Sequence, residues 1–593
     1  MTSDIQFFID RGADLKGKIS EAENKNRRLS SLRLVFFLIT AFAVIFAFVH
    51  PPMKILLLIA AAVTLTGFIS LCIKHGKSKA LYEHLLLLKE TNDRYIARIE
   101  GDFSNLKDTS PDIDIHGHDY AFDLDVFGDV SLFNLYNISK TYLGREAFAK
   151  ELLGYNTHED ILRRQNACAE LMEKKEFLQE FEVLSIENRM EKSPNVLAGF
   201  CSGTETFDNK LKFIYKFMPV LWLIPIVLLI IGNRFYSAVA IGVGLINLLT
   251  WIFNTGKFTS RFNSASSLKK QVEGYASLYK LIEDEDIKSD LLNDLRKGGA
   301  STGKASEGLF KLAFVCTLIS LRSQPLFALI INSFFQFDLY CADKLLTWAG
   351  SHGTEIKKDL EQMSELEVLM CLSVVGIVSR ESCFPEVGEG AFFEGNDITH
   401  PLLDPKKAVS NSIKLSNETA LITGSNMSGK TTLIRTIGIV CILSYTGAPV
   451  PASSVKAGRM RVMSSMRIMD SIEEQMSTFR AELVRIAKIV EAGKEDKPLL
   501  FLIDEIFRGT NSADRTEGAL KVIQNLSKPH IMGLMTTHDY ALCDKVTETV
   551  KTVVYYHFTE KYNDDGITFD YKLHNGVSHE SNAKFLMRLV GIY

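Results

Sequence analysis

The segment 424–431 has the residue types and the spacing of a loop that binds phosphate. It reads Gly-Ser-Asn-Met-Ser-Gly-Lys-Thr and fits the pattern GxxxxGK[ST]. Glycines let backbone N–H groups turn toward an anion, and a helix that starts after the loop adds the positive end of its dipole. In such a loop Lys430 reaches the β- and γ-phosphates of a nucleoside triphosphate, and Thr431 binds Mg²⁺. The candidate phosphate-binding residues are Gly424, Ser425, Asn426, Met427, Ser428, Gly429, Lys430, Thr431 and Thr432.

Two adjacent carboxylates, Asp504 and Glu505, follow the apolar run 499–503. Asp504 is placed to hold Mg²⁺ together with Thr431, and Glu505 is the candidate base that orients or deprotonates an attacking water. The alternative is a pair of ordinary surface acids. A continuous apolar strand leading into the pair disfavours that alternative, because such strands are buried in parallel sheets.

A histidine, His538, follows a further apolar run at 531–536. At the carboxyl end of a strand, His538 could hydrogen-bond the γ-phosphate or the attacking water, although a single histidine can also be purely structural. The order of loop, acid pair and histidine favours the functional interpretation. We therefore expect ATP hydrolysis with Mg²⁺, in which Glu505, His538 and Lys430 are catalytic.

These residues need a scaffold, and the sequence after residue 376 supplies one. Short apolar or β-branched runs at 420–423, 499–503, 531–536 and 550–556 alternate with helical patterns. Alternation of this kind predicts a parallel sheet with helices on its faces, and the carboxyl ends of its strands then meet at one edge. The expected fold of this part is an α/β P-loop domain.

Four apolar runs of a different kind lie earlier in the chain, at 34–53, 55–73, 217–233 and 235–256. Each lacks charged residues and has about the length that a helix needs to cross a bilayer, roughly 17–25 residues. Buried core helices are the alternative, but such helices usually carry polar residues at helical spacing, and these runs are apolar all round. We predict two transmembrane helical hairpins, four membrane-embedded helices in all.

Most basic residues near the hairpins lie at their open ends, before the first helix and after the second, and few lie in the turns. Several Lys and Arg residues precede 34 and follow 73, and the same holds around 217–256, whereas the two turns contain only Lys54 and Arg234. The positive-inside rule predicts a multi-pass protein of the inner (cytoplasmic) membrane with both termini and the ATPase domain in the cytoplasm. A fifth apolar run, 312–339, is interrupted by Arg322 and Pro325; we expect a buried helix there, and a dip into the membrane is the alternative.

Composition excludes several classes. With 593 residues, 46% hydrophobic and 23% charged, the chain is neither disordered nor fibrous. Its 67 basic and 71 acidic residues give a net charge of −4, which argues against coating nucleic acid through overall charge and leaves a local basic patch possible. Nine cysteines without a CxxC pair indicate reduced thiols rather than a disulfide framework or a metal site.

The sequence thus predicts six segments. They are a cytoplasmic N-terminal segment 1–32, transmembrane hairpin 1 at 33–74, an all-α helical region at 75–205, transmembrane hairpin 2 at 206–256, a helical lever region at 257–375, and the α/β domain at 376–593.

Beyond the generic loop, the chain resembles the MutS family of mismatch-repair ATPases. The Asn426-Met427 pair inside the loop is distinctive of that family, and a series of further segments matches it in order. These segments are Thr399-His400-Pro401, Val409-Ser410-Asn411, residues 447–452, Ser477-Thr478-Phe479, residues 504–510 and Thr537-His538. Residues 131–144, 161–165 and 365–369 are more weakly similar to the family's helical core domain.

The resemblance implies roles for further residues. Val409 and Asn411 would lie on the adenine side of the nucleotide, and Ser477 of one subunit would complete the site of the other, so that ATP closes a homodimer. It also implies a DNA partner. However, nothing like the family's mismatch-reading domain precedes the helical region, and hairpin 2 lies where relatives carry their lever helices and DNA clamp. Gln475 and Met476 stand where the family commonly has a glycine.

The leading hypothesis is a membrane-anchored MutS-like ATPase dimer that couples ATP to contact with mismatched or structured DNA. One alternative is a transporter-type ATPase, which the lack of an LSGGQ-like signature and of intramembrane charges disfavours. The other is a membrane scaffold that uses ATP only to hold a dimer together, which Glu505 disfavours because a binding-only site needs no water-orienting carboxylate.

Overall fold

The computed structural model describes residues 3–106, 113–115, 117–154, 159–190, 207–298, 304–425, 427–467, 478–507, 511–563 and 566–577. The chain forms two compact units. The first comprises Met1–Leu106 with Glu176–Val183, and the second comprises Lys107–Lys175 with Leu184–Tyr593.

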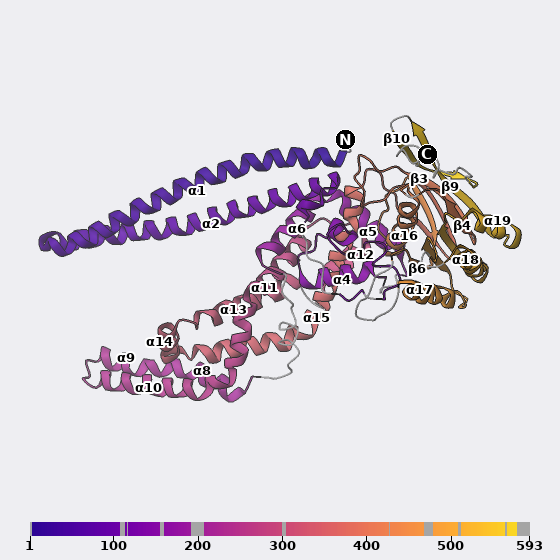
Figure 1. Ribbon diagram of the computed structural model, residues 1–593. Helices are drawn as coiled ribbons and strands as arrows, with labels where there is room; N and C mark the ends of the chain where they lie inside the picture. The colour runs from indigo at the N-terminus through magenta and orange to yellow at the C-terminus, as the bar shows by residue number, and fades with distance from the viewer. Residues whose placement is uncertain are drawn as a thin grey trace. The chain divides into compact units, whose positions relative to one another are not determined.

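The first unit is built on one long antiparallel helical hairpin (Figure 1). Helices α1 (Ser3–Val49) and α2 (Lys54–Glu100) have 47 residues each and are joined by a 3₁₀ turn at Pro51–Met53. Two prolines end α1 because proline lacks an N–H and fits only the first turn of a helix. The turn lies where the sequence predicted it, but both helices extend well beyond the apolar runs. Near the turn the apolar side chains are exposed, Phe48 at 72% and Ile55 at 77%.

The opposite end of this hairpin is packed against part of α6 (Lys175–Glu187). Leu15, Leu85, Leu88 and Val183 are buried there in one apolar cluster. A buried amide adds specificity: Asn92 Nδ2 donates to the Phe8 carbonyl oxygen at 2.8 Å, and Gln179 Nε2 donates to Asn92 Oδ1 at 3.1 Å. Hydrophobic and polar contacts with α6 therefore hold this end of the hairpin.

The helical part of the second unit contains most of the remaining helices. They are α3 (Leu132–Tyr136), α4 (Tyr142–Leu152), α5 (Ile161–Glu173), α8 (Asn209–Phe217), α9 (Leu223–Ile230), α10 (Tyr236–Thr255), α11 (Thr259–Asp284), α12 (Asp290–Arg296), α13 (Ala305–Leu321), α14 (Pro325–Phe335) and α15 (Phe337–Val378). The longest, α15, contacts α8, α4 and α5 along its 42 residues.

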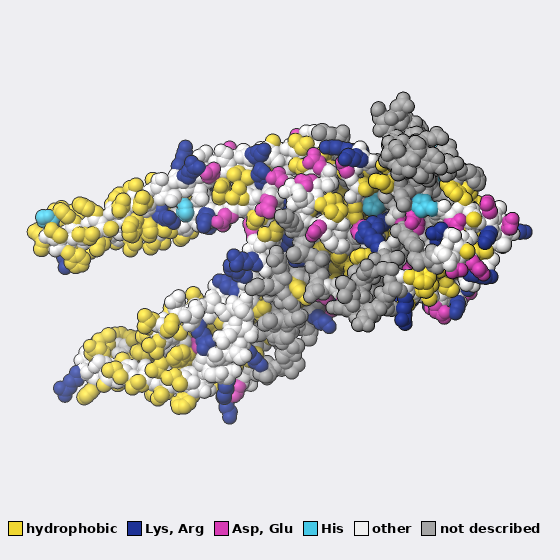
Figure 2. Space-filling model, viewed as in Figure 1, with side chains coloured by type: hydrophobic (Ala, Val, Ile, Leu, Met, Phe, Trp, Pro, Cys, Tyr) yellow, Lys and Arg dark blue, Asp and Glu magenta, His cyan; other side chains and the backbone are white. Residues whose placement is uncertain are grey.

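Four helices of the described chain are long and apolar enough to cross a membrane, judged by length and composition. They span Asp4–Val49, Pro51–Glu100, Asn209–Ile230 and Tyr236–Asp284. Figure 2 shows hydrophobic side chains gathered over the end of the α1–α2 hairpin, and over α9 and α10 in the second unit. The four predicted apolar runs therefore all form helices with exposed apolar surfaces.

The fifth apolar run differs from the expected buried helix. It forms two helices, α13 and α14, bent by 108° at a break where Pro325 begins the second one. One face of α13 is buried, including Leu312 and Ile319, as expected. In α14 only Ala328 and Asn332 are buried, so the expectation of burial was wrong for this helix. The first helix ends at Leu321, before Arg322 and the polar residues that follow it. Pro325 then starts a new helix, because proline fits the first turn of a helix but cannot continue one.

The α/β domain is centred on a six-stranded sheet of order β10-β9-β4-β8-β7-β6. All neighbouring strands are parallel except the β9–β10 hairpin. The strands are β4 (Thr419–Thr423), β6 (Arg461–Ser465), β7 (Leu499–Asp504), β8 (Ile531–Thr536), β9 (Val553–Asn563) and β10 (Gly566–Asn575). The predicted parallel strands are confirmed, although β9 begins three residues later than expected and continues into a hairpin.

Helices connect these strands, and a second sheet that the sequence did not predict lies beside them. The helices are α16 (Lys430–Thr446), α17 (Thr478–Ala492), α18 (Ser512–Leu526) and α19 (Tyr540–Thr549). The second sheet has the order β1-β5-β2-β3 and consists of β1 (Glu386–Gly388), β5 (Ser454–Gly458), β2 (Phe392–Ile398) and β3 (Asn411–Ser416).

An acidic segment, residues 119–125, binds the α/β domain within the second unit. Asp123 is fully buried and accepts hydrogen bonds from Ser464 Oγ at 2.7 Å and from the Arg467 backbone N–H at 2.9 Å. Asp125 pairs with Arg435 of α16 at 2.9 Å and with Arg467 at 2.5 Å. This Asp-rich segment is thus a packed structural element that contacts the helix carrying Lys430.

A buried arginine makes the second tie between α16 and the helical region. Arg164 on α5 donates through Nε to the Thr446 carbonyl at the end of α16, at 2.6 Å. Its guanidinium also pairs with Glu151 at 3.0 Å and with Glu365 of α15. Arg164 and Glu151 are 5% and 0% exposed, so the removal of Arg164 would take its guanidinium partner from the buried Glu151 carboxylate.

We expect Arg164→Ala to lower the free energy of unfolding by about 3–5 kcal/mol, since breaking a buried ion pair leaves an uncompensated charge. The neighbouring Arg163 offers a matched control, because its pair with Asp294 is exposed; Arg163→Ala should cost about 0–1 kcal/mol. Thermal unfolding of the detergent-solubilised chain, followed by circular dichroism, compares the two. Equal shifts in Tm would contradict the assignment.

A second buried carboxylate, Glu367 of α15, lies among the helices. It accepts hydrogen bonds from Thr141 Oγ1 at 2.6 Å and from Ser139 Oγ. Burial raises the pKa of Glu367 to about 7 from 4.5, and the two hydroxyl hydrogen bonds offset only part of that shift. Between pH 4.5 and about 7, folding is therefore accompanied by the binding of a proton to Glu367.

Stability should fall as pH rises from 4.5 to about 7, since the folded protein keeps a proton that the unfolded chain has released. The loss is on the order of 3 kcal/mol by linkage. Glu367→Gln should remove this dependence, whereas Glu361→Gln, at an exposed position of the same helix, should keep it. Tm measured across this pH range tests the assignment, and an unchanged profile in Glu367→Gln would contradict it.

Candidate nucleotide site

The glycine-rich loop connects β4 to α16 at the carboxyl edge of the six-stranded sheet. Every residue of β4 is buried, and α16 begins at Lys430. Gly424 and Gly429 have φ of 141° and 110°, a region that L side chains rarely adopt. A Cβ on Gly424 would also lie 3.1 Å from the Phe558 carbonyl oxygen. Both glycines are therefore required by the path of the loop.

The Lys430 ammonium lies at the centre of this loop. Its Nζ donates to the carbonyl oxygens of Gly424 at 2.8 Å and of Ser425 at 2.6 Å, and it lies 3.4 Å from His538 Nε2. The loop is closed by hydrogen bonds from Ser428 Oγ to the Ser425 carbonyl and from Ser425 Oγ to Glu560. The cation and the N-terminus of α16 thus face the same point, which favours binding of an anion.

Asp504 joins three elements at this edge. Its Oδ2 accepts a hydrogen bond from Thr431 Oγ1 of α16 at 2.9 Å, and its Oδ1 accepts one from Thr536 Oγ1 of β8 at 2.6 Å. Asp504 is itself the last residue of β7. The oxygens of Thr431 and Asp504 lie side by side and fit Mg²⁺, which proteins bind through one or two carboxylates together with substrate phosphates.

Glu505 and His538 form a contact beside Lys430. Glu505 Oε1 lies 2.5 Å from His538 Nε2, and the Glu505 backbone N–H donates to Thr536 Oγ1 at 3.0 Å. Glu505 has a φ of 51°, so the chain turns sharply directly after β7. The structure therefore brings together Lys430, Glu505 and His538, as the sequence predicted; their catalytic roles remain predictions.

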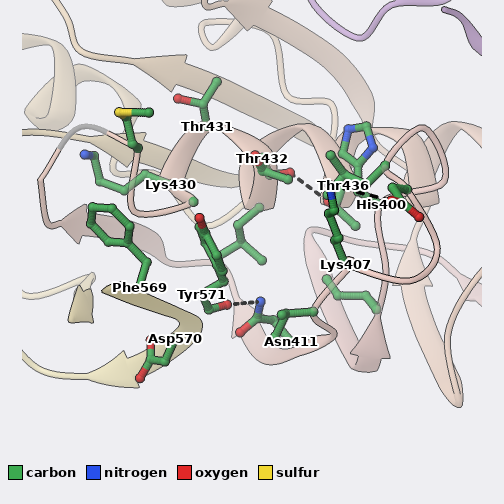
Figure 3. A pocket seen from close by; sticks show the side chains of 17 residues that line it. His400, Lys407, Asn411, Lys430, Thr431, Thr432, Thr436, Phe569, Asp570 and Tyr571 are labelled. Carbon is green, nitrogen blue, oxygen red and sulfur yellow. Dashed lines mark hydrogen bonds and ion pairs between the residues drawn. The ribbon is translucent and has the colours of Figure 1, made fainter. Parts of the chain in front are cut away.

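A cavity of about 720 Å³ lies next to the loop (Figure 3). Gly429, Lys430 and the first turns of α16 form one side of it, where Met427, Thr431, Thr432 and Thr436 also contribute. His400, Val409 and Asn411 line it from the second sheet and its loops. Burial lowers the pKa of His400 to about 3, so this imidazole is neutral at physiological pH.

Asn411 holds another part of the cavity wall. Its Nδ2 donates to the Tyr571 carbonyl at 3.0 Å, and its Oδ1 accepts from the Leu573 backbone N–H at 2.8 Å. Both ends of the amide are therefore committed to the backbone of β10. Val409 and Asn411 line the cavity as expected, and Asn411 also positions β10.

Two aromatic residues of β10, Phe569 and Tyr571, line the cavity and were missed by sequence reasoning. They lie about 140 residues after the loop, at the end of a hairpin whose Asp565-Gly566 pair is a common turn signal. That signal could have revealed the hairpin, but not that it reaches the cavity.

Two predicted site residues, Asn426 and Ser477, lie outside the described residues. Helix α17 begins at Thr478, directly after Ser477. The Phe479 ring on α17 packs against Phe507, close behind the acid pair, with ring centroids 6.2 Å apart.

A phosphate-type loop at the carboxyl edge of a parallel sheet, with a Thr–Asp pair and a second acid beside it, defines a P-loop nucleotide-binding domain. Residues 420–592 match the family model of MutS domain V. This C-terminal part of the chain is thus similar to domain V of the MutS family.

Curated relatives agree with this assignment. The chain is 30% identical over 246 residues to Endonuclease MutS2 of Clostridium novyi, which covers 40% of this chain and 30% of the relative. It is 29% identical over 253 residues to DNA mismatch repair protein MutS of Methanosarcina mazei (41% and 28%). It is 30% identical over 240 residues to DNA mismatch repair protein spellchecker 1 of Drosophila melanogaster (38% and 26%). The chain spans less than a third of the length of these relatives.

We expect Tyr571→Ala to weaken binding of a fluorescent ATP analogue by about tenfold, because stacked aromatic contacts contribute roughly 0.5–1.5 kcal/mol beyond the area they bury. The backbone of β10 should stay in place, since the Asn411 side-chain amide bonds to main-chain atoms of Tyr571 and Leu573, which the substitution keeps. Tyr571→Phe, which keeps the ring, should bind like the parent. Fluorescence titration gives both affinities, and equal losses in the two variants would exclude a role for the ring.

Proposed function

We propose that this chain is a membrane-anchored MutS-like ATPase that binds and hydrolyses ATP in the cavity beside Lys430. The observation that carries the proposal is the contact series at the sheet edge. Lys430 lies 3.4 Å from His538, His538 lies 2.5 Å from Glu505, and Thr431 bonds to Asp504 at 2.9 Å. A cation, a base and a metal-ligating pair are therefore grouped where a triphosphate would end.

Each side chain has a chemical task in this proposal. Lys430 and the N-terminus of α16 stabilise negative charge on the transferred phosphate. Glu505 orients the attacking water and accepts its proton, and His538 holds the Glu505 carboxylate in position. Thr431 and Asp504 would hold a Mg²⁺ ion, which would supply further charge neutralisation at the phosphate oxygens.

Membrane anchoring through four helices is part of the proposal. The apolar runs of both hairpins are exposed on the described helices, and basic residues flank them rather than their turns. By the positive-inside rule the protein is multi-pass in the inner (cytoplasmic) membrane, with its termini and the ATPase domain in the cytoplasm.

Homodimer formation and DNA binding complete the proposal. Ser477 would contact the γ-phosphate held by the partner subunit, which is supported by the resemblance of its sequence context to the family's signature turn. The proposal of DNA binding is supported by the similarity to relatives named as mismatch-repair proteins and an endonuclease. ATP would then switch helical arms that contact mismatched or structured DNA near the membrane.

Glu505→Gln is the central test. In detergent-purified protein we expect this variant to lose about 10²–10⁴-fold in kcat, as removal of a general base does, while its affinity for ATP is kept. Glu548→Gln, at an exposed glutamate of α19, should hydrolyse ATP like the parent. Hydrolysis by Glu505→Gln at the parental rate would favour the scaffold alternative.

The same preparation tests the partners. We expect ATP to convert Glu505→Gln from monomer to dimer in light scattering, and mismatched or branched DNA to stimulate the parental ATPase more than homoduplex does. Absence of nucleotide-dependent association would remove the dimer. Absence of stimulation, together with absence of duplex binding that weakens between roughly 50 and 200 mM salt, would remove the DNA partner.

A further inference from the structure

Helix α14 exposes an apolar surface that is not part of the four predicted spans. No charged residue occurs between Gln324 and Phe337. Leu326 is 75% exposed, and Ile330 and Phe335 are each 59% exposed. Exposure of such an apolar surface to water is unfavourable, and its contact with hydrocarbon lowers the free energy.

A buried polar network attaches this helix to α10. Asp338, directly after α14, is 1% exposed and accepts hydrogen bonds from Trp251 Nε1 of α10 and from Arg322 Nε, both at 2.9 Å. Gln336 Nε2 donates to the Asn247 carbonyl of α10 at 2.6 Å. The chain that follows the carboxyl end of α14 is therefore fixed to α10 of the second hairpin.

Tryptophans mark the level at which α14 lies. Trp222 Nε1 donates to the Ser333 carbonyl at 3.2 Å, and its ring stacks on Phe334 with centroids 4.4 Å apart. Trp251 lies near the same, carboxyl end of α14 through its hydrogen bond to Asp338 in the first turn of α15. Both tryptophans lie near the basic ends of hairpin 2, after Lys216 and before Lys257. Tryptophan is enriched at membrane–water interfaces, and basic residues mark the cytoplasmic side.

We propose that α14 is a fifth membrane segment, an interfacial helix that buries its exposed apolar side chains among the lipid acyl chains of the cytoplasmic leaflet. The proposal rests on the membrane anchoring proposed above. It is supported by continuity, because α14 packs on α10 and extends the same exposed apolar surface. Helices of this type lie in the plane of the interface with their apolar face inserted.

The placement of α14 gives the membrane a direct mechanical link to the nucleotide domain. Helix α15 starts at Phe337, separated from the end of α14 by Gln336 alone, and continues without a break to Val378, eight residues before β1 begins at Glu386. At 1.5 Å per residue such a helix is about 63 Å long. Its first turn contains Asp338, so the network that fixes α14 also fixes the start of α15. Movement of the lipid interface and movement of this lever are therefore coupled.

Tryptophan quenching by brominated lipids tests the proposal on the full chain reconstituted in vesicles. Ile330→Trp places a probe on α14, Ile241→Trp places one on the exposed face of α10, and Leu162→Trp places one on an exposed position of α5 as the water-facing control. The parent, with its three native tryptophans, supplies the baseline. All four proteins should show the same melting temperature and gel-filtration profile, because the substituted positions are exposed.

We expect lipids brominated near the headgroup to quench the added tryptophan fluorescence of Ile330→Trp. Lipids brominated deeper in the acyl chain should quench that of Ile241→Trp, and neither kind of lipid should quench that of Leu162→Trp. Quenching of Ile241→Trp without quenching of Ile330→Trp would overturn the assignment of α14 and leave the membrane anchor intact; a second copy covering α14 would give this result. Absence of quenching in both would overturn the anchor as well.

Discussion

The carboxylate of Asp504 is the interaction on which the site depends. It lies at the end of β7. It accepts one hydrogen bond from the Thr431 hydroxyl, at the start of α16, and another from the Thr536 hydroxyl, at the end of β8. The Thr536 hydroxyl oxygen in turn accepts a hydrogen bond from the backbone N–H of Glu505. The start of α16, the end of β8 and the backbone of Glu505 are therefore positioned by one buried group whose two oxygens are both in use. Glu505 itself has a positive φ of 51°, so the chain changes direction directly after β7.

The parts of the fold that could be predicted are those with local signals. Parallel strands such as β4, β7 and β8 are buried on both faces, so they are continuous apolar runs that stand out from their surroundings. Their polar residues follow at the carboxyl ends, which is why the sequence alone is enough to group Lys430, Asp504, Glu505 and His538. The turn at Pro51 could be placed for a similarly local reason.

The parts that could not be predicted depend on contacts distant in sequence. Half-buried strands such as β2 and β3 alternate too weakly to separate from loops, so the second sheet was missed. Phe569 and Tyr571 reach the cavity only because Asn411, about 160 residues earlier, bonds to the backbone of β10. Composition alone also placed α14 in the interior, although its side chains are exposed.

The acidic segment 119–125 means that the boundary near residue 376 does not separate two independent folding units. Arg435 and Arg467 share Asp125, and Arg461 pairs with Asp119. Burial and the nearby Arg467 both lower the pKa of Arg435, and the Asp125 and Asp123 carboxylates oppose that shift. A fragment cut at residue 376 would leave these guanidinium groups repelling one another beside the first turns of α16. Excising the ATPase part thus changes the electrostatic potential at its own phosphate loop.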